Sequence, residues 1–159
     1  MTQTAYIALG SNLGDREGTL RRAIDMMRGR RGLAVEAVSA FIENEPEGSP
    51  AGQGAYLNAV AKVSTTLRPE ELLGALQEIE QALGRNRAAE GFRGARTCDL
   101  DILLIGDLVV DSPTLTVPHP RMHTRRFVLA PLAEIAPLAR HPRLNKTAVE
   151  LLADLEAQP

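Results

Sequence analysis

Hydrophobic residues recur along the chain with two different periods, one typical of strands and one typical of helices. Three short runs rich in β-branched or aromatic residues show alternating or continuous apolar character, and a fourth starts at Cys98. Two longer runs repeat apolar residues three or four positions apart and are followed by glycine, as amphipathic helices often are. In chain order, strands and helices are expected at residues 5–10, 16–30, 33–42, 56–63, 68–84 and 98–105.

The order of these elements is strand, helix, strand, strand, helix, strand. No helix separates the runs at 33–42 and 56–63, which argues against a doubly wound parallel fold. The pattern predicts an α+β, ferredoxin-like βαββαβ sandwich, with an antiparallel sheet and helices on one face. A C-terminal appendage of a short hairpin and helices follows, and residues 1–159 are expected to form a single domain.

The last strand of this plan carries the most informative pattern. Alternation places Cys98, Leu100, Ile102 and Leu104 on one face and two aspartates, Asp99 and Asp101, on the other. Side chains two apart on a strand lie roughly 7 Å apart at Cα, so both carboxylates point into the same space. Because such a pair is costly without a positive partner, one or two Mg²⁺ ions are expected there. The alternative is a solvent-facing aspartate pair at a sheet edge.

A basic loop precedes this strand. It brings several arginines close to the two aspartates, which suggests a polyphosphate held between Mg²⁺ and guanidinium groups. The alternative is a set of solvated or aspartate-paired arginines. The arginines concerned are Arg85, Arg87, Arg93 and Arg96.

Three further features, which involve five residues, carry weaker signals. Tyr56 and Asn58 share one face of a strand, which suggests a ligand site, or else a core tyrosine beside a strand-end asparagine. Gln77 and Glu80 share part of a helix face, where simple solvation is the ordinary interpretation. His119 lies between two prolines that restrict its backbone.

Composition excludes several classes of protein. The net charge of -2 disfavours non-specific binding of nucleic acid. No apolar run approaches the ~20 residues of a membrane span, and the first residues do not resemble a signal peptide. The single cysteine, Cys98, fits a small buried hydrophobic residue in a reducing compartment. A cytoplasmic protein without a membrane or nucleic-acid partner is therefore expected.

Four stretches together resemble one family, hydroxymethyldihydropterin pyrophosphokinase (HPPK), an enzyme family of folate synthesis. The strand motif R-x-x-D-x-D followed by V-P-H-P-R is the most specific of these likenesses, which run from about residue 4 to residue 137 in the family's order. The four stretches are residues 6–14, 56–59, 94–103 and 115–122. The resemblance implies the ferredoxin-like fold and transfer of pyrophosphate from ATP to the hydroxymethyl group of 6-hydroxymethyl-7,8-dihydropterin, with AMP released.

The resemblance also implies roles for individual residues. It implies catalytic roles for Arg85, Arg96, Asp99 and Asp101, with two Mg²⁺ ions on Asp99 and Asp101. It implies ATP binding by Gln77, Glu80, Arg87, Arg96, Ile102, Thr116, His119 and Arg125. It implies pterin binding by Asn44, Glu45, Glu47, Tyr56, Asn58 and Phe127. ATP and the hydroxymethyldihydropterin are then the partners, and a monomer is expected.

The chain departs from the family pattern in two loops. Acidic residues flank Pro46, where the family commonly has threonine before the proline and an apolar residue after it. Phe92 lies one position earlier than the family's aromatic residue. These differences leave an alternative open, an ATP-binding module on the same fold that is non-catalytic or altered in specificity.

Overall fold

The computed structural model describes residues 2–12, 14–44, 55–84 and 98–158. Its main sheet is antiparallel, with strand order β2-β4-β1-β5 and a short strand, β3, that also pairs with β4. The strands are β1 (Gln3–Ser11), β2 (Leu33–Val38), β3 (Ile42–Asn44), β4 (Tyr56–Thr65) and β5 (Asp99–Ile105). The expected α+β fold with an antiparallel sheet is confirmed, and the strands and helices follow the βαββαβ order.

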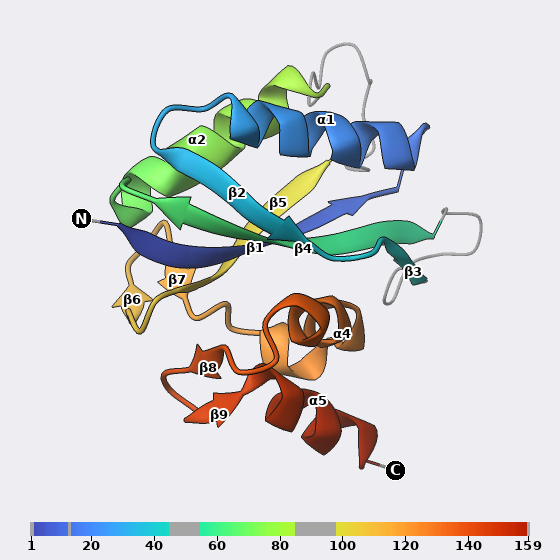
Figure 1. The fold of residues 1–159 in the computed structure, drawn as a ribbon, viewed down its shortest axis with the longest axis vertical. Coiled ribbons are helices and arrows are strands. Elements are labelled where there is room, and N and C mark those ends of the chain that lie inside the picture. The colour runs from blue at the N-terminus through green and yellow to red at the C-terminus, as the bar shows by residue number, and fades with distance from the viewer. Residues whose placement is uncertain (1, 13, 45–54, 85–97, 159) are drawn as a thin grey trace.

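Two helices cover one face of this sheet, above it in Figure 1. They are α1 (Arg16–Arg28) and α2 (Pro69–Ala82). The side chain of Asp15 caps α1 by accepting from the backbone N–H of Gly18 at 3.0 Å. Both helices bury an apolar stripe, which includes Leu20 of α1 and Leu76 of α2, against the inner residues of β1 and β5. This cluster is the larger of two hydrophobic cores in the described part of the chain.

The opposite face of the sheet is covered by the C-terminal elements (Figure 1), which the sequence predicted as an appendage without assigning them to a face. Helix α4 (Arg126–Ile135) packs on this face, and α5 (Ala148–Glu156) packs on α4. Leu129 and Leu132 of α4 join Leu103 and Leu104 of β5 in the second core. The physical reason lies in β5, where the residues after Asp101 are apolar on both faces and therefore need a layer on each side.

Two details of the strands differ from the sequence prediction. The expected strand at 33–42 is interrupted after Val38, because the Ser39 hydroxyl accepts from the backbone N–H of Val60 at 2.9 Å, and pairing resumes at β3. Leu104 does not share a face with Leu100. A shift in the β1–β5 register, which skips Leu103, turns Leu104 to the α4 side.

Short hairpins complete the fold. Strands β6 (Val110–Asp111) and β7 (Thr116–Val117) pair beside β5, and β8 (Arg140–His141) pairs with β9 (Lys146–Thr147). A single 3-10 turn, η1 (Met122–Thr124), leads into α4.

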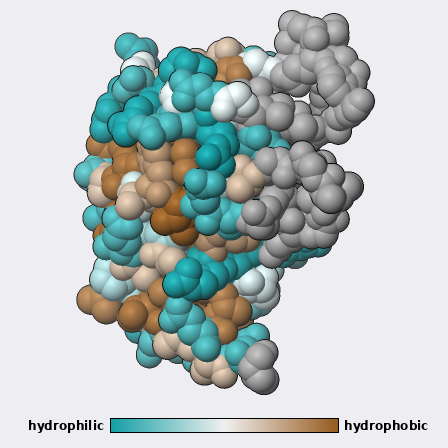
Figure 2. All heavy atoms as spheres, turned by 90° about the vertical axis from the view of Figure 1, so that its right-hand side faces the viewer, coloured by the Kyte–Doolittle hydropathy of each residue, from teal (hydrophilic) through white to brown (hydrophobic). Residues whose placement is uncertain are grey.

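Figure 2 shows one face of the molecule, on which the helical layer at the top is mainly hydrophilic. Hydrophobic side chains appear at the level of the sheet and of the C-terminal elements below it. None of the helices in the described ranges is both long enough and apolar enough to cross a bilayer.

Candidate active site

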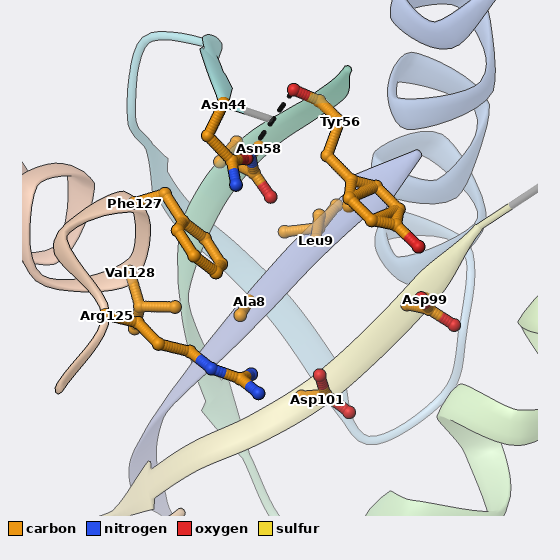
Figure 3. A pocket seen from close by; sticks show the side chains of 12 residues that line it. Ala8, Leu9, Asn44, Tyr56, Asn58, Asp99, Asp101, Arg125, Phe127 and Val128 are labelled. Atoms are coloured by element: carbon orange, nitrogen blue, oxygen red, sulfur yellow. Dashed lines mark hydrogen bonds between the residues drawn. The ribbon is translucent and has the colours of Figure 1, made fainter. Parts of the chain in front are cut away.

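A pocket of about 280 Å³ lies between the sheet and the start of α4, on the face opposite α1 and α2 (Figure 3). Its lining residues come from β1, β3, β4, β5 and the start of α4, which are distant in the sequence. Its lining residues are Ala8, Leu9, Gly10, Asn44, Tyr56, Asn58, Ala59, Asp99, Asp101, Arg125, Phe127 and Val128. This volume lies just below the usual range of about 300–1,000 Å³ for small-molecule pockets.

The two aspartates lie at the start of β5 and face this pocket (Figure 3). In the β1–β5 pairing, Asp99 lies opposite Gly10 and Asp101 lies opposite Ala8, so small residues on β1 leave space beside both carboxylates. Asp99 is half-buried and Asp101 is exposed, whereas the intervening Leu100 is buried in the core. The period-two alternation expected from the sequence is therefore confirmed over residues 98–102.

Positive charge reaches the pocket from the opposite side. Figure 3 shows the Arg125 guanidinium pointing from the start of α4 toward Asp101. The same guanidinium lies 5.8 Å from the centroid of the Phe127 ring, a cation–π contact that orients both side chains. A carboxylate, a guanidinium and an aromatic face therefore meet in one small space.

His119 lies close to this charged group. Its backbone N–H donates to the Leu103 carbonyl of β5 at 2.9 Å, and its Nδ1 accepts from the backbone N–H of Arg121 at 3.1 Å. Burial lowers the pKa of His119, and the nearby Arg125 and Arg121 lower it further, while Asp101 opposes the shift. A neutral His119 with Nδ1 as acceptor carries its proton on Nε2, which makes Nε2 a hydrogen-bond donor.

The amide of Asn58 has a defined orientation. Its Nδ2 donates to the side-chain oxygen of Asn44 and lies 3.4 Å from the carbonyl oxygens of Ile42 and Tyr56. Its Oδ1 lies beside Gly10, where an added Cβ would come within 3.4 Å of it. Asn58 thus directs its donor to the β3–β4 hairpin and its acceptor toward the pocket.

Aromatic and aliphatic side chains form the remaining walls. Figure 3 shows the Phe127 ring between Val128 and Ala8, and the Tyr56 ring over Leu9. Such a slot, with a flat aromatic face and one fixed polar acceptor, is suited to a planar heterocycle that can donate a hydrogen bond.

The two aspartates fit a magnesium site of the kind that shares its metal with a bound phosphate. Within the described ranges no cluster of three or more His, Cys, Asp or Glu residues could hold a metal by itself. Mg²⁺ commonly uses one or two carboxylates and completes its coordination with water and substrate phosphates. Asp99 and Asp101, two apart on one strand with room beside them, meet that requirement.

Several residues expected on the ATP side do not line the pocket. Gln77 is exposed on α2, and Thr116 is half-buried in β7. The Ile102 side chain is buried in the core, so only its backbone can reach a ligand. Glu80 is buried, and its Oε2 accepts from the backbone N–H of Leu100 at 2.7 Å, so simple solvation is wrong for this residue.

Other expected site residues fall outside the described ranges. They are Glu45, Glu47, Arg85, Arg87, Arg93 and Arg96. The expectation that the loop arginines lie close to the aspartates therefore falls outside the described residues, whereas Arg125, at the start of α4, lines the described pocket.

The pocket also contains residues that the sequence analysis did not single out. Ala8, Leu9, Gly10 and Ala59 come from the central strands β1 and β4, and Val128 comes from α4. Their only signal in the sequence is the glycine at the end of the first strand, because small apolar residues look alike in a core and in a pocket wall. Their place follows from the β1–β4 and β1–β5 pairing.

Comparison with known proteins identifies relatives of the whole chain. The family model "7,8-dihydro-6-hydroxymethylpterin-pyrophosphokinase (HPPK)" matches residues 6–137. A 2-amino-4-hydroxy-6-hydroxymethyldihydropteridine pyrophosphokinase of Bacillus subtilis is 47% identical over 135 residues, which cover 85% of this chain and 79% of the relative. The protein of the same name from Pseudomonas aeruginosa is 44% identical over 153 residues, which cover 96% of this chain and 92% of the relative.

Solved structures agree on the fold. Wild-type HPPK-DHPS of Plasmodium falciparum, crystallised with pteroate, superposes with a TM-score of 0.75 at 15% identity and covers 97% of this chain. The match takes up 42% of that crystallised chain, so the present chain spans less than half of its length.

Proposed function

The chain belongs to the HPPK family, and we propose that it uses the pocket at the start of β5 to transfer pyrophosphate from ATP to 6-hydroxymethyl-7,8-dihydropterin, a step of folate biosynthesis. The observation that carries this proposal is that one pocket combines the Asp99–Asp101 pair with the Asn58–Phe127 slot. The aspartate pair, which can hold the metal ions of a phosphate group, and the slot, which can hold a planar ring, therefore line the same cavity. AMP is the second product.

The pterin is assigned to the slot formed by Tyr56, Asn58 and Phe127. The Asn58 acceptor faces the pocket, where it can receive a hydrogen bond from a ring N–H or amino group. Phe127 offers the aromatic face on which a planar ring stacks. Asn44 fixes the Asn58 amide, and the resemblance adds Glu45 and Glu47 to the same side.

The triphosphate is assigned to the other end of the pocket. Asp99 and Asp101 would hold two Mg²⁺ ions, which supply charge neutralisation and orientation for the phosphates when bound. Arg125 and the Nε2 donor of neutral His119 lie where they can bind phosphate oxygens. The family resemblance adds Arg85, Arg87 and Arg96 as further cationic groups, with Arg85 and Arg96 stabilising the transferred group.

The remaining ATP-side assignments rest on the resemblance. They are Gln77, Glu80, Ile102 and Thr116. For the reaction itself, the protein must hold the hydroxymethyl oxygen in line with the β-phosphorus, since transfer to a correctly oriented acceptor avoids most of the entropic cost. Leu9, Ala59 and Val128 form apolar walls of the same pocket.

The decisive experiment is an AMP-release assay with purified protein, Mg²⁺ and ATP, with and without the hydroxymethyldihydropterin. The proposal expects AMP in a one-to-one ratio with pterin consumed and almost none without pterin. ADP as the only product, or AMP release that ignores the pterin, would contradict it. ATP binding without pterin-dependent AMP release would favour the non-catalytic or altered-specificity module.

We also propose that the enzyme acts as a cytoplasmic monomer. Cys98 is a buried cysteine, which is compatible with a reducing compartment. The net charge of -2 gives no broad attraction to nucleic acid. Size-exclusion chromatography with light scattering tests the monomer, and a mass near 34 kDa would refute it, since the chain has a mass of 17.2 kDa.

A further inference from the structure

Glu80 lies on α2 rather than on any element that lines the pocket, yet it contacts the strand that carries the two aspartates. We propose that Glu80 is a positioning residue, whose buried carboxylate fixes the backbone between Asp99 and Asp101 and thereby the spacing and direction of both metal-binding side chains. The inference rests on the proposed function of that pair.

The contact is made at the centre of the D-x-D motif. Glu80 Oε2 accepts from the backbone N–H of Leu100 at 2.7 Å, a distance typical of a strong charge-assisted hydrogen bond. In the described sheet, β5 is an edge strand that pairs only with β1. Leu100 is the residue between the two aspartates. At this residue, the Glu80 carboxylate accepts the hydrogen bond that the carbonyl of a neighbouring strand would otherwise accept.

The burial of the Glu80 carboxylate is energetically unfavourable by itself, which indicates that its hydrogen bond to β5 has a structural role. Only 6% of Glu80 is exposed, and a buried carboxylate is costly unless hydrogen bonds compensate. Its neighbours on the buried face of α2 include Leu76 and Ile79, which are apolar. An apolar side chain at position 80 would leave the Leu100 N–H without this acceptor, which is unfavourable for a buried donor.

The hydrogen bond from Leu100 to Glu80 affects the pocket through the backbone of β5. On a strand, the Cα positions of Asp99 and Asp101 are fixed once the peptide groups of Leu100 are fixed, and their side chains leave the opposite face from Leu100. Leu100 is itself buried in the core and lies opposite Leu9 of β1, and Glu80 holds it from the other edge of the strand. Residues that orient metal ligands in this way typically change metal affinity by 10- to 100-fold when removed.

The test compares Glu80→Ala, Glu80→Gln and the control Gln81→Ala, which removes an exposed side chain one position further along α2. Free Mn²⁺ is counted by electron paramagnetic resonance in the presence of α,β-methylene-ATP, whose α–β bridge cannot be cleaved. Amide hydrogen exchange of Leu100 is followed by ¹⁵N NMR in protein without nucleotide. Neither measurement depends on turnover.

The expected result is a roughly tenfold or greater rise in the apparent Mn²⁺ dissociation constant for Glu80→Ala, with faster exchange of the Leu100 amide. Glu80→Gln keeps an oxygen acceptor and should stay within about threefold of wild type, and Gln81→Ala should match wild type. If Glu80→Ala does not fold, Glu80→Met, which keeps most of the side-chain volume but offers no oxygen acceptor to the Leu100 N–H, takes its place with the same expected result.

Unchanged Mn²⁺ affinity in Glu80→Ala would overturn the inference. So would a glutamine variant with a normally protected Leu100 amide and tenfold weaker Mn²⁺ binding, since the charge rather than the hydrogen bond would then matter. Failure of the proposed function has a different signature, because wild-type protein would then release no pterin-dependent AMP while the Leu100 amide still responded to substitution of Glu80.

Discussion

The side-chain amide of Asn58 on β4 donates a hydrogen bond to the side-chain oxygen of Asn44 on β3. This contact decides which end of the Asn58 amide faces the pocket, because the same nitrogen is also directed at the carbonyls of Ile42 and Tyr56. The pocket therefore meets the Asn58 oxygen, and a ligand that donates a hydrogen bond is favoured over one that only accepts.

Substitution of Asn44 should weaken pterin binding without touching the phosphate side. Asn44→Ala removes one acceptor for the Asn58 amide, so the amide is no longer held in one orientation. At about 0.5–1.5 kcal/mol for one hydrogen bond, we expect the KM for pterin to rise roughly 3- to 10-fold with kcat nearly unchanged. Steady-state kinetics at saturating ATP measure this, with Asn44→Asp as the variant that keeps an acceptor. A larger effect on the KM for ATP would contradict the assignment.

Substitution of either pocket aspartate should abolish turnover and leave the fold intact. Asp99→Ala and Asp101→Ala each remove a magnesium ligand, while neither side chain belongs to a hydrophobic core. We expect AMP release to fall by at least about 10²-fold, with the thermal midpoint near that of wild type. Asp107→Ala is the matched control, because this exposed aspartate lies in the turn that follows β5. Near-normal turnover in either pocket variant would rule out the metal assignment.

The protonation of His141 should make stability rise as the pH rises toward and through about 6.5. Burial lowers the pKa of His141 from its ordinary value of 6.5, and the charges of His123 and Arg143 lower it further. Its Nδ1 accepts from the backbone N–H groups of Arg143 and Leu144, at 3.2 and 3.1 Å, so a proton on Nδ1 would disrupt both bonds.

The direction follows from proton binding. Between its folded-state pKa and 6.5, the unfolded chain binds a proton at His141 that the folded chain does not, so the free energy of unfolding falls as the pH falls through 6.5. His119 acts in the same direction, because its pKa is also lowered. His141→Asn keeps an acceptor at the Nδ1 position and cannot titrate. Urea unfolding at several pH values should therefore show a smaller slope for this variant, and an equal slope would refute the assignment.

Packing of α4 should be required for both stability and pterin binding. Leu129 of α4 is fully buried in the second core. Arg125 and Phe127, at the start of the same helix, line the pocket. Leu129→Ala should lower the free energy of unfolding by about 2–5 kcal/mol. Val149→Ala on α5, where the side chain is 45% exposed, should change it by less than about 0.5 kcal/mol. Urea denaturation of the two variants tests this, and equal losses would show that α4 is not anchored as described.

Much of the fold could be predicted from the sequence because local periodicity determines it. The apolar stripes of α1 and α2 and the alternation around Asp99 and Asp101 occur where the pattern placed them. The errors occur where a single contact outweighs the local pattern. The Ser39 hydroxyl interrupts the second strand, and the register shift at Leu103 turns Leu104 to the other face.

The sequence by itself determined the chemistry of this protein: two carboxylates at a fixed spacing on a strand, and arginines and a histidine able to bind phosphate. Only the tertiary structure decided which groups share a space. It brought Asn58, Phe127 and Arg125 to the aspartates, and it placed Glu80 behind them rather than in solvent. The physical reason is that side-chain direction along one strand follows from a local period of two, whereas contacts between distant elements depend on strand register and on which face each layer covers.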